Sequence, residues 1–237
     1  MIRTIKFQEH TSHPAAGCVE VNAGNTKILC TASIINQHVP RFLRDQHHGW
    51  LTAEYSMLPA ATHSRTDRDA TKGKVSARSS EIQRLIGRAL RSSVRLKQLP
   101  QMTLILDCDV IQADGSTRCH AINGAQIALV RALQRLQITK SLRKDPLKNL
   151  VAAVSAGIMD GQIVLDLDYQ KDKNADADIN IVMSEHGDLI EIQGTAENKP
   201  FSPAQLNLVL DKAWPAIESI IHMQKQLLEK PYPYTID

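Results

Sequence analysis

Short apolar runs joined by tight turns constrain the fold of this chain more than any other feature. The clearest pair, residues 151–159 and 162–169, flanks the two-residue turn Asp160-Gly161, which is a strong signal for a β-hairpin. Further runs that are rich in β-branched or alternating apolar residues predict strands at residues 25–35, 50–58, 103–111, 180–183 and 189–193. We therefore expect largely antiparallel or mixed sheets.

Helices are predicted between these strands. Residues 81–96 and 118–137 carry apolar residues at the three-to-four spacing of an amphipathic helix. The last helix is expected to begin at Ser202, with Pro203 at its first position and Gln205 completing a capping box. This mixture predicts an α+β fold in which mixed sheets carry packed helices.

Length and composition fit one compact unit. The chain has 237 residues, 43% of them hydrophobic, and no low-complexity segment or Pro/Gly-rich linker interrupts it. We therefore expect residues 1–237 to form a single domain with a well-buried core. The formal net charge of +3 does not by itself predict a nucleic-acid partner.

The cysteines and the N-terminal segment indicate a compartment. The four cysteines form no CxxC pair, and most lie in or beside apolar runs, which predicts buried, reduced thiols in a cytoplasmic protein. The polar N-terminal segment lacks the apolar core of a signal peptide. No stretch approaches the roughly 18 apolar residues of a membrane helix, so we expect no membrane partner.

The segment Gly115-Ser116-Thr117-Arg118 suits the binding of a phosphate group. Gly115 permits a sharp turn, and the N–H groups that open the following helix favour an anion. The two hydroxyl groups and the planar cation of Arg118 add further donors. The alternative is an ordinary strand–turn–helix connection in which Thr117 caps the helix.

A second segment, far away in the sequence, is acidic. Asp172, Asp176 and Asp178 lie at the start of a predicted strand. Clustered carboxylates repel one another, which a magnesium or manganese ion would relieve; alternatively, one of them takes up a proton and acts as a general acid. A solvated acidic loop is the other interpretation.

A long polar segment between residues 59 and 78 is rich in cations. Residues 65–78 carry five basic side chains against Asp67 and Asp69. Such a loop is suited to the phosphodiester backbone of a nucleic acid, although a soluble loop of mixed charge is the alternative. The basic residues are Arg65, Arg68, Lys72, Lys74 and Arg78.

Four longer stretches, taken together, resemble the bacterial ribonuclease PH family of phosphate-dependent 3′-exoribonucleases, which trim tRNA precursors. They are residues 39–59, 81–94, 106–118 and 191–197, and the likeness extends over residues 17–226. The resemblance implies two similar βαβ-type halves of the ribosomal protein S5 domain 2-like type. It also implies a homo-hexameric ring built as a trimer of dimers.

The same resemblance assigns site residues. It implies that inorganic phosphate, the co-substrate, is held by residues matching Arg78, Thr117 and Arg118, beside Ser116. The catalytic aspartates match Asp172 and Asp178, which would also hold Mg²⁺ if a metal takes part. The RNA-binding loop matches the segment that carries Arg65, Arg68, Lys72 and Lys74.

The chain departs from the family pattern at a few positions, without loss of a charged catalytic group. The expected function is phosphorolytic trimming of tRNA precursor 3′ ends, with release of nucleoside 5′-diphosphates. A catalytically weak RNA-binding ring subunit and a hydrolytic exoribonuclease remain the alternatives. The departures are Ala77, Ser79, Ser116, Lys171, Lys173 and Asn198.

Overall fold

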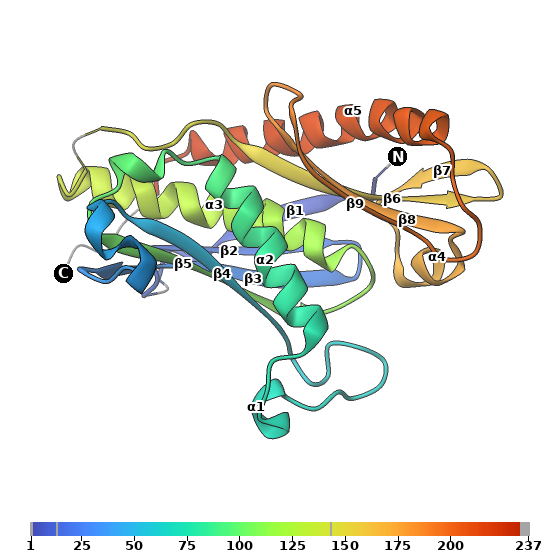
Figure 1. Cartoon of the computed structure of the whole chain (residues 1–237), viewed down its shortest axis with the longest axis horizontal. Helices are drawn as coiled ribbons and strands as arrows, with labels where there is room; N and C mark the ends of the chain where they lie inside the picture. Colours follow the sequence, from blue (N-terminus) through green and yellow to red (C-terminus); the bar gives the residue numbers. More distant parts are fainter. Residues whose placement is uncertain (1, 13, 143, 233–237) are drawn as a thin grey trace.

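The computed structural model describes residues 2–12, 14–142 and 144–232. It contains two β-sheets with helices packed on them (Figure 1). This is the predicted α+β architecture of mixed sheets with packed helices, divided into two halves.

The first half is built on a five-stranded sheet in the order β1-β2-β3-β5-β4. Neighbouring strands are antiparallel except for β4 and β5, which are parallel. Parallel neighbours need a crossover, and α2 (Ala77–Ser92) supplies it. The strands are β1 (Ile5–Glu9), β2 (Gly17–Ala23), β3 (Thr26–Asn36), β4 (Trp50–Met57) and β5 (Met102–Gln112).

The second half is a four-stranded antiparallel sheet in the order β7-β6-β8-β9. The hairpin predicted at Asp160-Gly161 is confirmed, because both residues have positive φ (48° and 75°), as a type I′ turn requires. The elements are β6 (Val151–Met159), β7 (Gln162–Leu165), α4 (Tyr169–Asn174), β8 (Ala177–Ser184), β9 (Leu189–Ala196) and α5 (Pro203–Leu228).

Helix α3 (Thr117–Ile138) connects the two halves. Seventeen of its 22 residues are buried, since it packs against β2, β3 and β5 of the first sheet and β6 of the second. Its Asn123 amide donates to the Ala153 carbonyl oxygen (3.0 Å) and accepts from the Ala153 N–H (2.7 Å). Asn123 thereby satisfies the backbone hydrogen-bonding groups of Ala153, in a part of β6 that does not pair with β7. A single hydrophobic core results.

The remaining helices cover the sheets. In Figure 1, α2 and α3 lie between the two sheets and α5 lies along the second sheet, where it contacts β6, β7 and β8. The start of α5 is as predicted: Ser202 and Gln205 form a capping box, and Pro203 is the first helical residue.

The sequence did not predict β1, β2 or α4, and β8 begins and β9 ends three residues beyond the predicted bounds. Two further boundaries are wrong. The helix predicted at 81–96 begins at Ala77 and ends at Ser92, because the Ser76 side chain caps it by accepting from the Ser79 N–H (3.0 Å). The strand predicted to reach residue 169 ends at Leu165, because Asp166 adopts a left-handed conformation (φ 54°) that turns the chain.

Three shorter elements complete the chain: the 3-10 helices η1 (Arg41–Gln46) and η2 (Leu96–Gln98), and α1 (Asp69–Lys72). All four cysteines are buried free thiols, as predicted. Among the described residues, no helix has an apolar stretch long enough to cross a bilayer.

Candidate active site

The predicted phosphate-binding and catalytic residues line one cleft of about 760 Å³ where the two halves meet. The first half contributes the start of α2 and the turn before α3. The second half contributes α4, β8 and β9. The cleft residues predicted from the sequence are Arg78, Ser116, Thr117, Arg118, Asp172 and Asp178.

The turn that leads into α3 is shaped by a close approach between the halves. Gly115 has a φ of 75°, and a Cβ at this position would overlap the backbone of Leu167 and Asp168. Glycine is therefore required there on two grounds, its positive φ and the lack of space.

Ser116 follows in the left-handed region, with a φ of 54°. This conformation favours glycine, and a non-glycine residue there costs about 1 kcal/mol. Its hydroxyl donates to the Leu167 carbonyl oxygen (2.8 Å) and lies 2.6 Å from the Ser155 hydroxyl. These two contacts occupy the hydroxyl and tie the turn to the second half.

The N-cap of α3 is Ser116, and Thr117 is the first helical residue. The interpretation in which Thr117 caps the helix is therefore wrong. The first N–H groups of a helix have no partner within it, and the helix dipole places partial positive charge there. The beginning of α3 thus offers backbone donors to an anion in the cleft.

Tyr55, on β4, supports this turn and was missed in the sequence. Its hydroxyl lies 2.7 Å from Thr117 Oγ1, and the residue is only 3% exposed. Burial raises the pKa of Tyr55 to about 12, although Thr117 and the nearby Arg78 and Arg118 act in the opposite direction. Tyr55 is therefore neutral and holds the Thr117 side chain in place. The alternation of β4 indicates an inward-facing residue here, but not its partner.

The two arginines of the cleft differ in how they are held. Arg118 lies within 3.5 Å of Glu81 Oε1 and 3.4 Å of Gln193 Oε1, and its side chain is 18% exposed. Arg78, the second residue of α2, is exposed. One cation is thus anchored between α2 and β9, and the other stands at the open side of the cleft.

The acidic residues face these cations. The pKa of Asp172 is raised, first by partial desolvation in the cleft and then by the neighbouring Asp178 and Glu197. Arg78 and Arg118 oppose this shift. Because such effects act over short distances, the two arginines and the carboxylates share one electrostatic environment.

Asp176 does not belong to this group, so the prediction that it joins Asp172 and Asp178 is wrong. It accepts from the Asp160 N–H (3.2 Å) and forms an ion pair with Lys199 (3.3 Å), which holds the start of β8. The third carboxylate that lines the cleft is Glu197. No group of three or more His, Cys, Asp or Glu residues in the described part of the chain is arranged to hold a metal ion.

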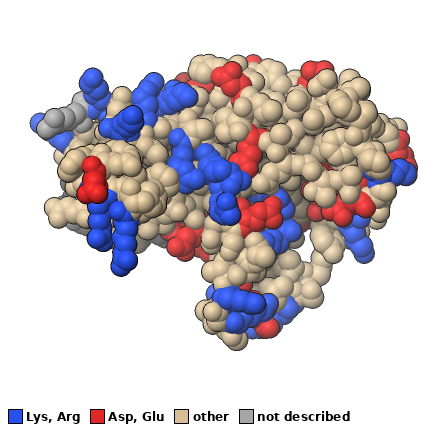
Figure 2. Space-filling model, viewed as in Figure 1, with Lys and Arg blue, Asp and Glu red and all other residues tan. Residues whose placement is uncertain are grey.

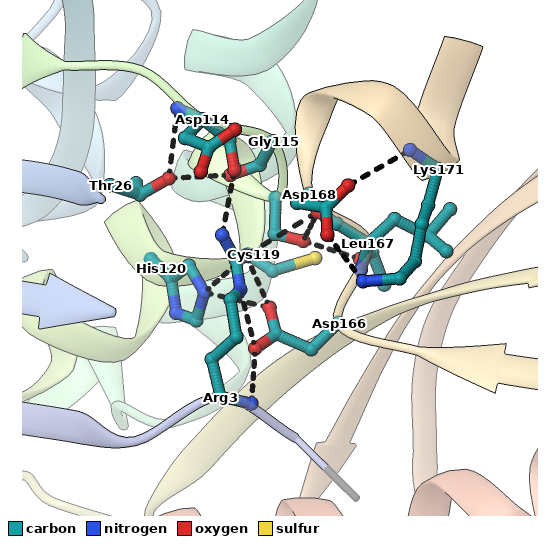
Figure 3. Close-up of polar contacts among 12 residues, drawn as sticks. Arg3, Thr26, Asp114, Gly115, Cys119, His120, Asp166, Leu167, Asp168 and Lys171 are labelled. Atoms are coloured by element: carbon teal, nitrogen blue, oxygen red, sulfur yellow. Dashed lines mark hydrogen bonds and ion pairs between the residues drawn. The ribbon is translucent and has the colours of Figure 1, made fainter. Parts of the chain in front are cut away.

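A buried polar network lies behind the cleft (Figure 3). Asp166 accepts from the Arg3 side chain (2.6 and 3.0 Å), from the Arg3 N–H (2.9 Å) and from His120 Nε2 (3.0 Å). Burial alone would raise the pKa of Asp166, but the hydrogen bonds from His120 and Arg3 outweigh it and lower the pKa.

The same network holds the turn before α3, where phosphate binding is predicted. Arg3 also donates to the Asp114 carbonyl oxygen (2.6 Å), and Thr26 donates to the Gly115 carbonyl oxygen (2.9 Å). Asp114 Oδ1 in turn accepts from the Tyr169 N–H (3.2 Å). The turn and α4 are therefore fixed to each other by partners 55 to 163 residues apart in the sequence.

Several departures from the ribonuclease PH pattern can now be placed. Lys171 pairs with Asp168, the N-cap of α4, and Ser79 accepts from the Ser76 hydroxyl (2.8 Å). Lys173 and Asn198 line the cleft. Ala77 is the first residue of α2.

The predicted RNA-binding residues lie outside the cleft, on the segment between β4 and α2. Figure 2 shows this segment as a lobe that projects from the body of the molecule and carries basic side chains. Within this segment, the Asp69 carboxylate accepts a hydrogen bond from the Ser76 N–H (3.2 Å), next to the start of α2. All four predicted residues are exposed: Arg65, Arg68, Lys72 and Lys74.

Solved structures share this fold. Rrp46 of rice (Oryza sativa) superposes with a TM-score of 0.78 at 18% identity, covering 97% of this chain and 96% of that one. A chain of the Archaeoglobus fulgidus exosome with RNA bound to the active site gives 0.73 at 16% identity, covering 97% and 88%. At these identities the likeness concerns the fold.

Family models match both halves of the sequence. Domain 1 of the 3′ exoribonuclease family matches residues 1–133, which include the turn before α3. Domain 2 of the same family matches residues 149–214, which hold the acidic residues of the cleft. Because the first match alone covers more than half of the sequence, this chain belongs to the 3′ exoribonuclease family.

Proposed function

We propose that this protein is a phosphorolytic 3′-to-5′ exoribonuclease of the ribonuclease PH type. It would transfer the terminal nucleotide of an RNA to inorganic phosphate and release a nucleoside 5′-diphosphate. The observation that carries this proposal is the arrangement of one cleft, in which Arg78, Arg118 and the start of α3 face Asp172 and Asp178. The two arginines, which would bind phosphate, thereby lie beside the two aspartates, which would assist departure of the ribose 3′-oxygen.

Phosphate is already an anionic nucleophile, so it needs position and neutralisation more than deprotonation. Arg118 supplies a fixed two-pronged donor, and Arg78 supplies a second cation at the open side. Thr117 and the first N–H groups of α3 satisfy further phosphate oxygens. The Ser116 hydroxyl, which donates to Leu167, contributes through the backbone shape of the turn.

In the reaction, a phosphate oxygen attacks the phosphorus of the last phosphodiester. The bond from phosphorus to the 3′-oxygen of the penultimate ribose breaks. That oxygen takes the electron pair and acquires a proton. Asp172 or Asp178 serves this leaving oxygen, either as a general acid or as a metal ligand.

The residues present fit a magnesium ion. Asp172 and Asp178 would supply two carboxylates, and the raised pKa of Asp172 reflects partial desolvation and the neighbouring Asp178 and Glu197, whose negative charge a cation would offset. Magnesium is commonly bound by one or two carboxylates together with substrate phosphates. When bound, it would neutralise charge on the phosphates and the leaving oxygen.

RNA would be guided to the cleft by Arg65, Arg68, Lys72 and Lys74, whose charges attract the backbone without reading sequence. We propose tRNA precursor 3′ ends as the substrate and a homo-hexameric ring, a trimer of dimers, as the assembly. A cytoplasmic location fits the buried free cysteines.

A catalytically weak RNA-binding ring subunit is the second candidate. The structural likeness to Rrp46 and to an exosome chain favours it. The presence of Arg78, Arg118, Asp172 and Asp178 in one cleft favours the active enzyme instead.

Incubation of a tRNA precursor with and without inorganic phosphate tests these proposals. Phosphate-dependent release of nucleoside 5′-diphosphates is the expected result. A hydrolytic enzyme would release 5′-monophosphates without phosphate. Binding of the RNA without any shortening would support the ring-subunit candidate.

A further inference from the structure

An exposed aromatic ring stands in the cleft without a function in the phosphate chemistry. Tyr169, the first residue of α4, is 47% exposed. Among the described residues that line the cleft, it alone is aromatic. A large ring left in contact with water forgoes favourable burial that a bound ligand would restore.

One contact fixes the Tyr169 backbone and another involves its ring. The Tyr169 N–H donates to Asp114 Oδ1 (3.2 Å), which ties this residue to the phosphate-binding turn. The His63 ring packs against Tyr169 in an edge arrangement, with centroids 6.3 Å apart and planes inclined by 62°. A ring positioned in this way is presented to a ligand at little cost in conformational entropy.

Its position relative to the acid is set by the helix. Tyr169 precedes Asp172 by three residues, and residues at this spacing are neighbours on one helix face. Both residues line the cleft, so the ring shares it with the carboxylate that is proposed to serve the reacting atoms. In an exoribonuclease, the nucleotide nearest these atoms is the one being removed.

We propose that Tyr169 stacks on the base of the 3′-terminal nucleotide, and this inference rests on the proposed function. The ligand class is thus a nucleobase, bound through its π-face. Every base has such a face, so stacking tolerates all four. This suits an enzyme that must continue through any sequence.

A double-mutant cycle tests the contact. Tyr169→Ala and Tyr169→Phe are each compared with the unmodified protein on an RNA with a normal 3′ end and on one whose terminal nucleotide lacks its base. Removal of a stacking aromatic costs about five- to 150-fold per base. We expect a loss in this range in kcat/KM for RNA from Tyr169→Ala or from the abasic end, and little further loss when both are combined. Tyr169→Phe keeps the ring and should retain near-normal values.

Controls separate this contact from damage elsewhere. The KM for phosphate should be unchanged in Tyr169→Ala, and an RNA abasic at its fifth nucleotide from the 3′ end should react normally. If the loss from Tyr169→Ala and the loss from the abasic end multiply when both changes are combined, the two groups do not interact and the proposal is wrong. Coupling only to the penultimate base would equally overturn the assignment to the terminal one.

The same cycle is run as equilibrium binding without phosphate, by fluorescence anisotropy. A protein that binds RNA but does not shorten it would contradict the proposed function and still report on the stacking. In that case, coupling between Tyr169 and the terminal base sustains this inference, and its absence ends it.

Discussion

The two walls of the cleft are built differently. The proposed phosphate-binding wall begins a helix with 17 of 22 residues buried, and its Thr117 side chain is held by the buried Tyr55. The acidic wall includes α4, in which all six residues are exposed. Polar links from Asp114, Arg3 and Asp166 position the segment that leads into α4. The comparison indicates that the placement of Thr117 and Arg118 depends on the core, whereas the placement of Asp172 depends on a few hydrogen bonds.

The largest expected effect comes from the acidic wall. Asp178 is a half-buried residue on β8, and Asp178→Asn removes its charge while keeping the size of the side chain. We expect a folded protein with normal RNA binding and a loss of about three orders of magnitude in turnover. Near-normal phosphorolysis, measured by nucleoside diphosphate release, would remove Asp178 from the catalytic residues.

The next effect tests the phosphate-binding wall. Arg118→Ala removes the anchored cation and should raise the KM for phosphate roughly 100-fold, the scale of a lost charge-assisted pair. RNA affinity should change far less. Arg118→Lys is the matched control, since it keeps the charge but loses the planar fork. Equal losses in phosphate use and RNA binding would contradict the proposal that Arg118 binds phosphate.

The link between the walls is tested by Arg3→Ala. Breaking the buried pair with Asp166 should cost about 3 kcal/mol of stability and, because the turn and α4 lose a shared support, lower kcat roughly tenfold. Added guanidinium should restore part of kcat. Since the pKa of Asp166 is lowered in the folded state, its contribution is present at neutral pH and is lost on acidification.

Thermal unfolding at several pH values provides the second measurement for this variant. The unmodified protein should lose more stability than Arg3→Ala as the pH falls below about 4, the ordinary range of an aspartate. Parallel losses in the two proteins would show that Arg3 does not act through Asp166. An unchanged kcat would show that the two walls do not need this link.

Changes in the projecting loop should have a smaller effect, and on RNA binding rather than on phosphate use. Combined neutralisation of Arg65, Arg68 and Lys72 to Gln should weaken RNA binding and reduce the dependence on salt by about one unit per lost phosphate contact. The KM for phosphate should stay the same. An unchanged salt slope would mean that this loop does not contact the RNA backbone.

The smallest effect distinguishes the two functions proposed for Asp172. The pKa of this residue is raised, so the pH range over which it titrates lies above that of an ordinary aspartate. A metal ligand must be ionised, so kcat should rise with pH through this range. A general acid must be protonated, so kcat should fall through it. Comparison with Asp172→Asn shows which limb of the profile belongs to this residue.

Local signals predicted much of the fold. The turn at Asp160-Gly161 and the capping box at Ser202 depend on neighbours within a few residues, and both are confirmed. The boundary at residue 165 was missed because the turn at Asp166 depends on Arg3 and His120, which are distant in the sequence.

The residues of the site also separate into those that the sequence indicated and those that depend on distant partners. Resemblance to a family indicated Arg78, Thr117 and Arg118 on one side and Asp172 and Asp178 on the other, and these residues line one cleft. The sequence did not indicate Tyr55 or Glu197, because only strand register and the packing of the two halves bring these residues to the cleft.

By itself, the sequence predicted the long helices, the strands from β3 onward, the Asp160-Gly161 turn and the residue types available for chemistry, since these follow from short-range spacing. It did not predict β1, β2 or α4. Only the tertiary structure decided which carboxylates share the cleft, with Glu197 in place of Asp176, and which serine hydroxyl is already engaged. The physical reason is that partners more than 100 residues apart in sequence, such as Arg3 and Asp166, meet through the packing of both sheets on one buried helix.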